Sequence, residues 1–351
     1  MRNKTIIFLA LVFFAIGIIL LLPKTTKKTY AAGTTLSETV KLLSSGSSWS
    51  TGASGVYYTN SHEYRYIGAE VNNYVWFNDD MYRIIGVFDD YSHGIEGQEL
   101  VKIIRNRKIG SYAWGIYNSS ATSGTYYGYK NDWTGNTTGI KANANVLLNE
   151  YFYNKTNTSS TYGACSDWTY YHSDTNYRTN DCSIVVGYGI DSSLKNYIEE
   201  VTWYLKGYTG NGYNKQNFYL CERGQSTDTT NCMSGNSGAY DASMTGKIGL
   251  MYASDYLYAS GYYSNDDTTV VSSSYYGNKN WLYQGFEWTL TPDANSAYSV
   301  FYIYNSGYIS TYESKYAHNI RPTFYLKSSV YVTGGDGSFD NPYTIACDDC
   351  D

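Results

Sequence analysis

The chain has 351 residues, of which 42% are hydrophobic and only 16% are charged. Residues 1–32 hold five of the 25 basic residues and none of the 31 acidic ones, so residues 33–351 carry 20 basic and 31 acidic side chains, a net charge of −11. This balance argues against nucleic-acid binding, which needs a basic face. The 43 Tyr, 33 Gly and 4 Pro are typical of a β-rich extracellular protein with long polar loops.

The N-terminal segment, residues 1–32, resembles an export signal. Arg2 and Lys4 precede an unbroken apolar run over residues 6–22, which Pro23 ends. The core of a cleaved signal peptide has about 7–15 residues and a spanning helix about 17–25, so the run suits an uncleaved anchor, although residues 29–31 offer a cleavage site. We expect a single-pass N-terminal anchor or a secreted protein, with the rest of the chain outside the membrane in either case.

The composition then divides the remaining chain into three parts. Residues 33–55 are predicted to form a short helix over 34–43 and a Ser/Gly-rich tether over 44–55. Residues 56–346 are predicted to form the folded ectodomain, and residues 347–351 a short acidic tail with a CxxC motif.

Alternating and helical patterns predict the elements of the first part of this ectodomain. They are a hairpin over residues 64–88 that turns at 78–80, a strand over 99–106, helices over 144–153 and 192–206, and a strand over 246–252. The second helix rests on an apolar stripe at helical spacing, with Asp191 as its N-cap; the stripe consists of Leu194, Ile198, Val201 and Leu205.

The sequence pattern of the C-terminal region predicts further strands over residues 288–290, 299–304 and 320–326, and a closing hairpin over 330–345. In the middle strand, Phe301 and Ile303 share one face, and Val300, Tyr302 and Tyr304 share the other. Together these elements predict an α+β class, rich in β-structure, with two main helices and long polar loops.

Several phrases of the chain match one family pattern. They occur in this order: NNYVWFNDDMYRIIGVF, LVKIIRN, Leu148-Asn149, GKIGLMYASDY, EWTL and IRPTFYL. Together they resemble a family of uncharacterised surface proteins from Firmicute bacteria. Tyr82 stands where that family usually has Trp, and Asn319-Ile320 where it has Gly-Val.

The wider resemblance is to the C-type lectin-like fold in its formylglycine-generating-enzyme-like version, over about residues 64–345. It implies a ligand face built from residues 261–319. The resembling oxidases bind copper through a C-terminal cysteine pair, whereas this chain has no Cys between Met233 and Ala346. That departure argues against the same activity.

Aromatic side chains among Ser, Asn and Gly mark the candidate binding surface, because Tyr combines a large ring with a hydroxyl group. The alternative is that many of these rings fill sheet positions. The candidate ligand-binding residues are Trp281, Tyr302, Tyr304, Asn305, Tyr308, Tyr312, Tyr316 and His318.

Buried-looking charges suggest a structural ion pair. Arg321 lies in an apolar strand and needs an acidic partner, for which we expect Asp255 or Glu222, with Glu287 as the third candidate. The same three carboxylates are the candidates for general acid–base work if the protein is instead a hydrolase.

The six cysteines form three neighbouring pairs, as expected in an exported protein. We expect disulfides between Cys165 and Cys182, between Cys221 and Cys232, and between Cys347 and Cys350.

No cofactor is expected, because no metal-binding motif links the histidines. Calcium at Asp336 and Asp340, or at residues 265–267, is an alternative that turn chemistry explains as well.

We therefore expect a non-enzymatic bacterial surface or secreted protein that binds an extracellular glycan or protein, with no catalytic residues. An extracellular carboxylate-dependent hydrolase and a structural envelope protein without a specific ligand are the alternatives.

Overall fold

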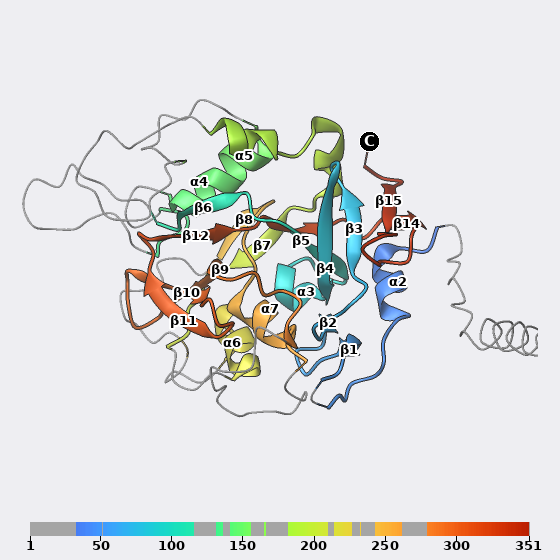
Figure 1. Ribbon diagram of the computed structural model, residues 1–351, viewed down its shortest axis with the longest axis horizontal. Coiled ribbons are helices and arrows are strands. Elements are labelled where there is room, and N and C mark those ends of the chain that lie inside the picture. The colour runs from blue at the N-terminus through green and yellow to red at the C-terminus, as the bar shows by residue number, and fades with distance from the viewer. Residues whose placement is uncertain are drawn as a thin grey trace, which may run out of the picture. The chain divides into compact units, whose positions relative to one another are not determined.

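The structure is a computed structural model that describes residues 33–50, 52–115, 131–135, 141–155, 165, 182–209, 214–226, 232, 243–261 and 279–350. These residues belong to one compact unit, Ala32–Asp351. They form a mixed α+β fold rich in strands (Figure 1), which confirms the predicted class. The predicted leader, residues 1–32, lies outside the described residues.

The larger sheet has six strands in the order β1-β2-β4-β5-β13, with β3 paired to β4. Its strands are β1 (Gly55–Tyr58), β2 (Tyr64–Ile67), β3 (Tyr74–Phe77), β4 (Asp80–Phe88), β5 (Leu100–Arg105) and β13 (Thr323–Leu326). Every residue of β5 and β13 is buried, including the charged Lys102 and Arg105 of β5.

The predicted hairpin between β3 and β4 is confirmed. Its two turn residues, Asn78 and Asp79, have φ values of 57° and 52°. Positive φ at both central positions defines a type I′ turn, and Asn and Asp tolerate this conformation better than most residues.

The second sheet has the order β11-β10-β9-β12-β6. Its strands are β6 (Gly110–Ala113), β9 (Glu287–Pro292), β10 (Ser299–Ile303), β11 (Ile309–Glu313) and β12 (Ala317–Ile320). The single strand predicted over 320–326 is wrong: Ile320 ends β12 in this sheet, and Thr323 begins β13 in the other. Pro322, which cannot donate a backbone hydrogen bond, lies at this crossing.

Two two-stranded sheets complete the strands, and the first of them corrects two further predictions. One pairs β7 (Val201–Tyr204) with β8 (Ser243–Gly246), and the other pairs β14 (Val330–Gly334) with β15 (Thr344–Cys347). The helix predicted over 192–206 is instead a 3-10 helix, Ser192–Tyr197, followed by β7. The strand predicted over 246–252 is wrong too, because only Gly246 belongs to β8.

The helices are short. They are α2 (Leu36–Lys41), α3 (Asp90–His93), α4 (Asn143–Val146), α5 (Ser183–Gly187), α6 (Lys215–Glu222) and α7 (Ala253–Tyr258). A π-helix, Leu147–Tyr153, continues α4, so the helix predicted over 144–153 is present.

The helix predicted over 34–43 is present as α2, and both this helix and the described part of the tether predicted over 44–55 pack against the domain. Leu36 and Val40 of α2 are fully buried, Thr35 forms a bridge with Tyr331, and Ser44 forms one with Val56. Residues 33–55 therefore belong to the folded unit. At the other end, Cys347 is the last residue of β15, so the predicted tail begins inside a strand.

Candidate functional site

An aromatic surface covers the outer side of the second sheet. The register pairs Tyr302 of β10 with Trp288 of β9 and with Ser310 of β11. Because side chains alternate along a strand, Phe301 and Ile303 lie on one face of β10 and Tyr302 on the other, as the sequence predicts. We call this surface the outer aromatic face; it consists of Phe286, Trp288, Tyr302, Tyr304, Tyr308, Tyr312, Tyr316 and His318.

The rings of the outer aromatic face contact one another continuously across the strands. His318 stacks on Tyr302 with ring centroids 4.9 Å apart and on Phe286 at 5.4 Å. Tyr302 contacts Tyr312 at 5.4 Å, and Tyr312 contacts Tyr316 at 4.6 Å. The pairs Tyr304–Tyr308 and Phe286–Tyr304, at 4.8 and 5.1 Å, extend the row. Aromatic pairs at these distances fix one another's positions.

The outer aromatic face has a buried base and an accessible upper layer. Trp288 is fully buried and Tyr302 is 5% exposed, whereas Phe286 is 37% and Tyr312 40% exposed. The predicted residues Tyr304, Tyr308, Tyr316 and His318 are half-buried. The exposed rings are therefore supported from below by other rings.

The outer aromatic face carries little charge. Burial lowers the pKa of His318 to about 4, so its imidazole is neutral at neutral pH. Its Nε2 is buried and has no hydrogen-bond partner among the described residues. The charged side chains that border Tyr312 and Tyr316, those of Glu313 and Lys315, form an ion pair with each other. The face thus suits an uncharged ligand.

Two of the predicted binding residues play other parts. Trp281 is buried, and its ring lies 4.5 Å from the Arg83 guanidinium, which Tyr74 covers on another side at 4.3 Å. Asn305 is exposed, and its backbone carbonyl accepts a hydrogen bond from the Tyr283 hydroxyl group. Trp281 is thus a packing residue, and its prediction as a ligand contact is corrected.

Sequence reasoning missed Phe286. This residue lies immediately before β9, and its ring contacts those of His318 and Tyr304. The alternation in Gly285-Phe-Glu-Trp288 could have revealed it.

Arg321 pairs with Glu287, the third of its predicted partners. Its Nε lies 2.6 Å from Glu287 Oε1, and its Nη2 lies 2.8 Å from Oε2. The expectation of Asp255 or Glu222 is wrong, because both belong to a different buried group. Glu287 starts β9 and Arg321 follows β12, so the parallel pairing of Asn319 with Glu287 brings the two together.

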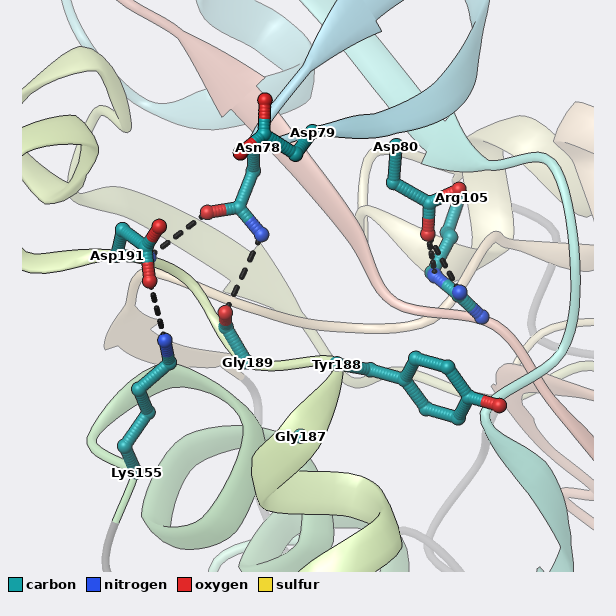
Figure 2. A pocket seen from close by; sticks show the side chains of 9 residues that line it. All are labelled: Asn78, Asp79, Asp80, Arg105, Lys155, Gly187, Tyr188, Gly189 and Asp191. Carbon is teal, nitrogen blue, oxygen red and sulfur yellow. Dashed lines mark hydrogen bonds and ion pairs between the residues drawn. The ribbon is translucent and has the colours of Figure 1, made fainter.

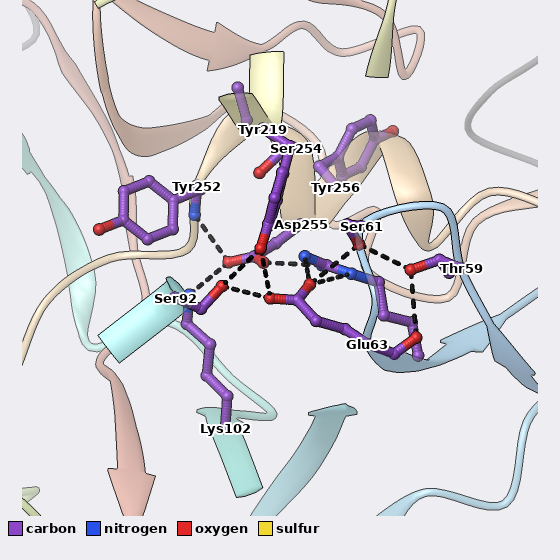
Figure 3. Close-up of polar contacts among 12 residues, drawn as sticks. Thr59, Ser61, Glu63, Ser92, Lys102, Tyr219, Tyr252, Ser254, Asp255 and Tyr256 are labelled. Atoms are coloured by element: carbon purple, nitrogen blue, oxygen red, sulfur yellow. Dashed lines mark hydrogen bonds and ion pairs between the residues drawn. The ribbon is translucent and has the colours of Figure 1, made fainter. Parts of the chain in front are cut away.

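Six charged side chains form a second buried group, which we call the buried ion cluster. Each is at most 4% exposed, and the three acids balance the three bases; the members are Glu63, Arg65, Lys102, Glu222, Arg223 and Asp255. Figure 3 shows part of this cluster, with Asp255 near the centre and Lys102 reaching toward it from below.

Asp255 is the hub of the buried ion cluster. Lys102 Nζ lies 2.6 Å from its Oδ2, and Arg65 Nη1 lies 2.9 Å from its Oδ1. Burial alone would raise the pKa of Asp255, but Lys102 and Arg65 outweigh it and hold the pKa at about 2. Glu222 accepts hydrogen bonds from Thr291 at 2.6 Å and from the Ser254 backbone N–H at 3.1 Å.

These contacts weaken the hydrolase alternative. Its three candidate carboxylates, those of Glu222, Asp255 and Glu287, are at most 1% exposed and are all ion-paired. General acid–base catalysis requires a carboxylate within reach of the substrate. None of these three can meet a substrate in this structure.

A polar pocket of about 420 Å³ lies away from the outer aromatic face. The β3–β4 turn, the end of β5 and the segments after the π-helix and α5 surround it (Figure 2). Its cations are compensated, because Arg105 pairs with Asp80 and Lys155 with Asp191. We assign this pocket no ligand.

The three predicted disulfides are confirmed. Such bonds persist in oxidising compartments and so point to an environment outside the cytoplasm. Within the described residues, no helix has both the length and the apolar character that crossing a bilayer requires.

Metal ligands do not gather in the part of the chain that the structure describes: no three His, Cys, Asp or Glu side chains there could hold one ion. Asp336, one of the calcium candidates, accepts the backbone N–H of Ser338 in a turn. Residues 265–267, the other candidates, lie outside the described residues, as do residues 262–278 of the predicted ligand loops.

No family model, curated protein or solved structure matches this chain. The resemblance to lectin-like surface proteins therefore stays a prediction.

Proposed function

We propose that this protein is a bacterial extracellular binding protein that recognises an uncharged glycan through the outer aromatic face. The observation that carries the proposal is the continuous row of rings from Tyr308 to Tyr316, with Phe286 and Tyr312 more than one third exposed. Exposed aromatic clusters on a monomer usually mark interaction sites.

The chemistry of the face supports a sugar ligand. Aromatic rings offer flat apolar surfaces to the C–H faces of a pyranose, and tyrosine hydroxyl groups at the rim can bond sugar hydroxyls. A neutral His318 and the paired Glu313 and Lys315 leave little to attract a charged ligand. Rigid support by Trp288 and Tyr302 lowers the entropic cost of binding.

We also propose the C-type lectin-like topology and the location that the sequence implies, either a single-pass anchor on the extracellular face of the membrane or secretion. A protein ligand would use the same rings, since aromatic residues are also enriched in protein interfaces. The structural envelope role requires that the face bind nothing.

A glycan array probed with the fragment 33–351 tests the proposal. The fragment starts at residue 33 because α2 and Trp49 are buried in the domain. The test variant carries Tyr308→Ala, Tyr312→Ala and Tyr316→Ala. Truncating a ring at the centre of an interface costs about 1 kcal/mol or more, so the triple variant should bind at least about 100-fold more weakly.

The matched control removes two rings that are at least as exposed but lie outside the second sheet, Tyr91 (60% exposed) and Phe339 (58%). The control should bind as the unchanged fragment does. If a folded triple variant binds the glycan as tightly as the unchanged fragment does, the binding site lies elsewhere. If the fragment binds no glycan but captures a protein that the triple variant does not capture, the ligand of the outer aromatic face is a protein.

A further inference from the structure

Lys102 and Asp255 form an unusually enclosed pair. Lys102 lies in the middle of β5, and Asp255 lies in the first turn of α7, 153 residues further along the chain. Neither side chain is exposed, and Lys102 Nζ lies 2.6 Å from Asp255 Oδ2. Figure 3 shows the Lys102 side chain extending from β5 with its amino group directed at this carboxylate.

Aromatic rings close the space around the amino group. Nζ lies 4.4 Å from the Tyr252 ring centroid and 5.3 Å from each of the ring centroids of Phe88, Trp203 and Tyr325. Such surroundings keep water out and penalise charge, so burial lowers the pKa of Lys102 to about 8. Condensation would remove both charges, and with them the cost of keeping each one away from water.

We propose that Lys102 and Asp255 condense after folding into an intramolecular amide bond between Nζ and Cγ. The chemistry balances without any further reactant. One proton passes from the Lys102 ammonium to Oδ2, the neutral amine attacks Cγ, and a second proton from Nζ follows as the Cγ–Oδ2 bond breaks. One water molecule leaves, and the ammonium and carboxylate charges disappear together.

Neighbouring donors assist the attack. Arg65 Nη1 lies 2.9 Å from Oδ1, where negative charge develops when the tetrahedral intermediate forms, so Arg65 acts as an oxyanion-stabilising group. The Tyr252 backbone N–H donates to Oδ2 at 2.9 Å. Arg65 is held in place by Glu63, with 3.0 Å between its Nε and Glu63 Oε2.

Proximity lowers the barrier to the reaction. Groups held in contact by a fold react with effective molarities of about 10⁵–10⁸ M, and the sealed surroundings hinder hydrolysis of the product. The first proton transfer is uphill, because Arg65 keeps Asp255 acidic, so we expect the bond to form over hours. After the amide bond forms, Arg65 stays paired with Glu63 and Arg223 with Glu222, so the remaining charges of the buried ion cluster still sum to zero.

Peptide mapping of the full chain tests the proposal. The protein is expressed in an oxidising compartment, kept folded for a day at pH 8, reduced, denatured and digested with trypsin. Cleavage after Arg83, Arg105, Lys247 and Lys279 should release peptide 84–105 joined to peptide 248–279. The joined species should be lighter than the sum of the two peptides by one water molecule, with no cleavage at Lys102.

The control is Lys102→Arg, which keeps the positive charge but lacks a reactive amine. Its Asp255 peptide should appear alone at full mass. A folded, disulfide-bonded wild-type protein that releases both peptides separately at full mass would overturn the proposal. A water loss that persists in Lys102→Arg would also overturn it, because the dehydration would then lie elsewhere. Wild-type mapping decides the question even if the variant does not fold.

Discussion

Removal of the Glu287 carboxylate should strongly destabilise the fold. In the unchanged protein, the Arg321 guanidinium makes two short hydrogen bonds to Glu287 and one, of 2.7 Å, to the Leu282 carbonyl. Glu287→Ala leaves a guanidinium that is 1% exposed and whose remaining hydrogen bond within the described residues is the one to Leu282. Breaking a buried pair by removing one partner costs about 3–5 kcal/mol.

Equilibrium unfolding of the fragment 33–351 in urea, with disulfides intact, measures this loss. The matched control is Glu99→Ala, which removes the surface pair between Lys41 and Glu99, whose side chains are 33% and 47% exposed. An exposed pair contributes about 0–1 kcal/mol. Replacing both buried partners, with Glu287→Met and Arg321→Met, should restore most of the stability because no unpaired charge remains.

The reasoning is refuted if Glu287→Ala and Glu99→Ala lower the free energy of unfolding equally. It also fails if the double replacement is as unstable as Glu287→Ala alone. Either result would mean that the charge of Arg321 is compensated without Glu287.

Three further changes test other parts of the structure. The pKa of His318 is lowered to about 4 in the folded state, so the protein loses stability as pH falls from about 6.5 to 4. His318→Gln removes this titration, and urea unfolding should show that the variant loses up to about 3 kcal/mol less than the unchanged protein over the same pH range. Cys165→Ala with Cys182→Ala opens a 17-residue loop and should lower the free energy of unfolding by about 3 kcal/mol; an unchanged midpoint would contradict this. Asp79 has φ of 52°, so Asp79→Val should cost about 1–2 kcal/mol relative to Asp79→Gly in thermal unfolding, and equal stabilities would argue against the type I′ turn.

Local signals in the sequence predict much of this fold. The β3–β4 hairpin is predicted because Asn78 and Asp79 are turn residues between two alternating segments. The disulfides are predicted because each cysteine has a near neighbour in a chain that carries an export signal. The placement of Tyr302 on the face opposite Phe301 and Ile303 follows from alternation alone.

Non-local pairing explains the failures. Val201 fits a helical stripe with Leu194 and Ile198, but Val201 and Trp203 also fit a strand, and pairing with β8 decides in favour of the strand. Likewise, the sequence around Pro322 does not show that the chain changes sheets there. Such contacts between distant segments override local propensity.

The sequence also does not show which buried charges pair with one another. Glu287 and Arg321 meet only because β9 and β12 run parallel, and nothing near either residue in the sequence encodes this. For the same reason the outer aromatic face is predicted as a set of residues, while the depth of each ring, such as the burial of Trp281, is not.

Hydroxyl-radical footprinting of the fragment 33–351, with and without a glycan that binds on the array, tests the binding role of the outer aromatic face most directly. Mass spectrometry then reports the oxidation of each ring. We predict that bound glycan protects Phe286 and Tyr312 and leaves Tyr91 and Phe339 unchanged. Equal oxidation of Phe286 and Tyr312 in the free and bound states would contradict the account.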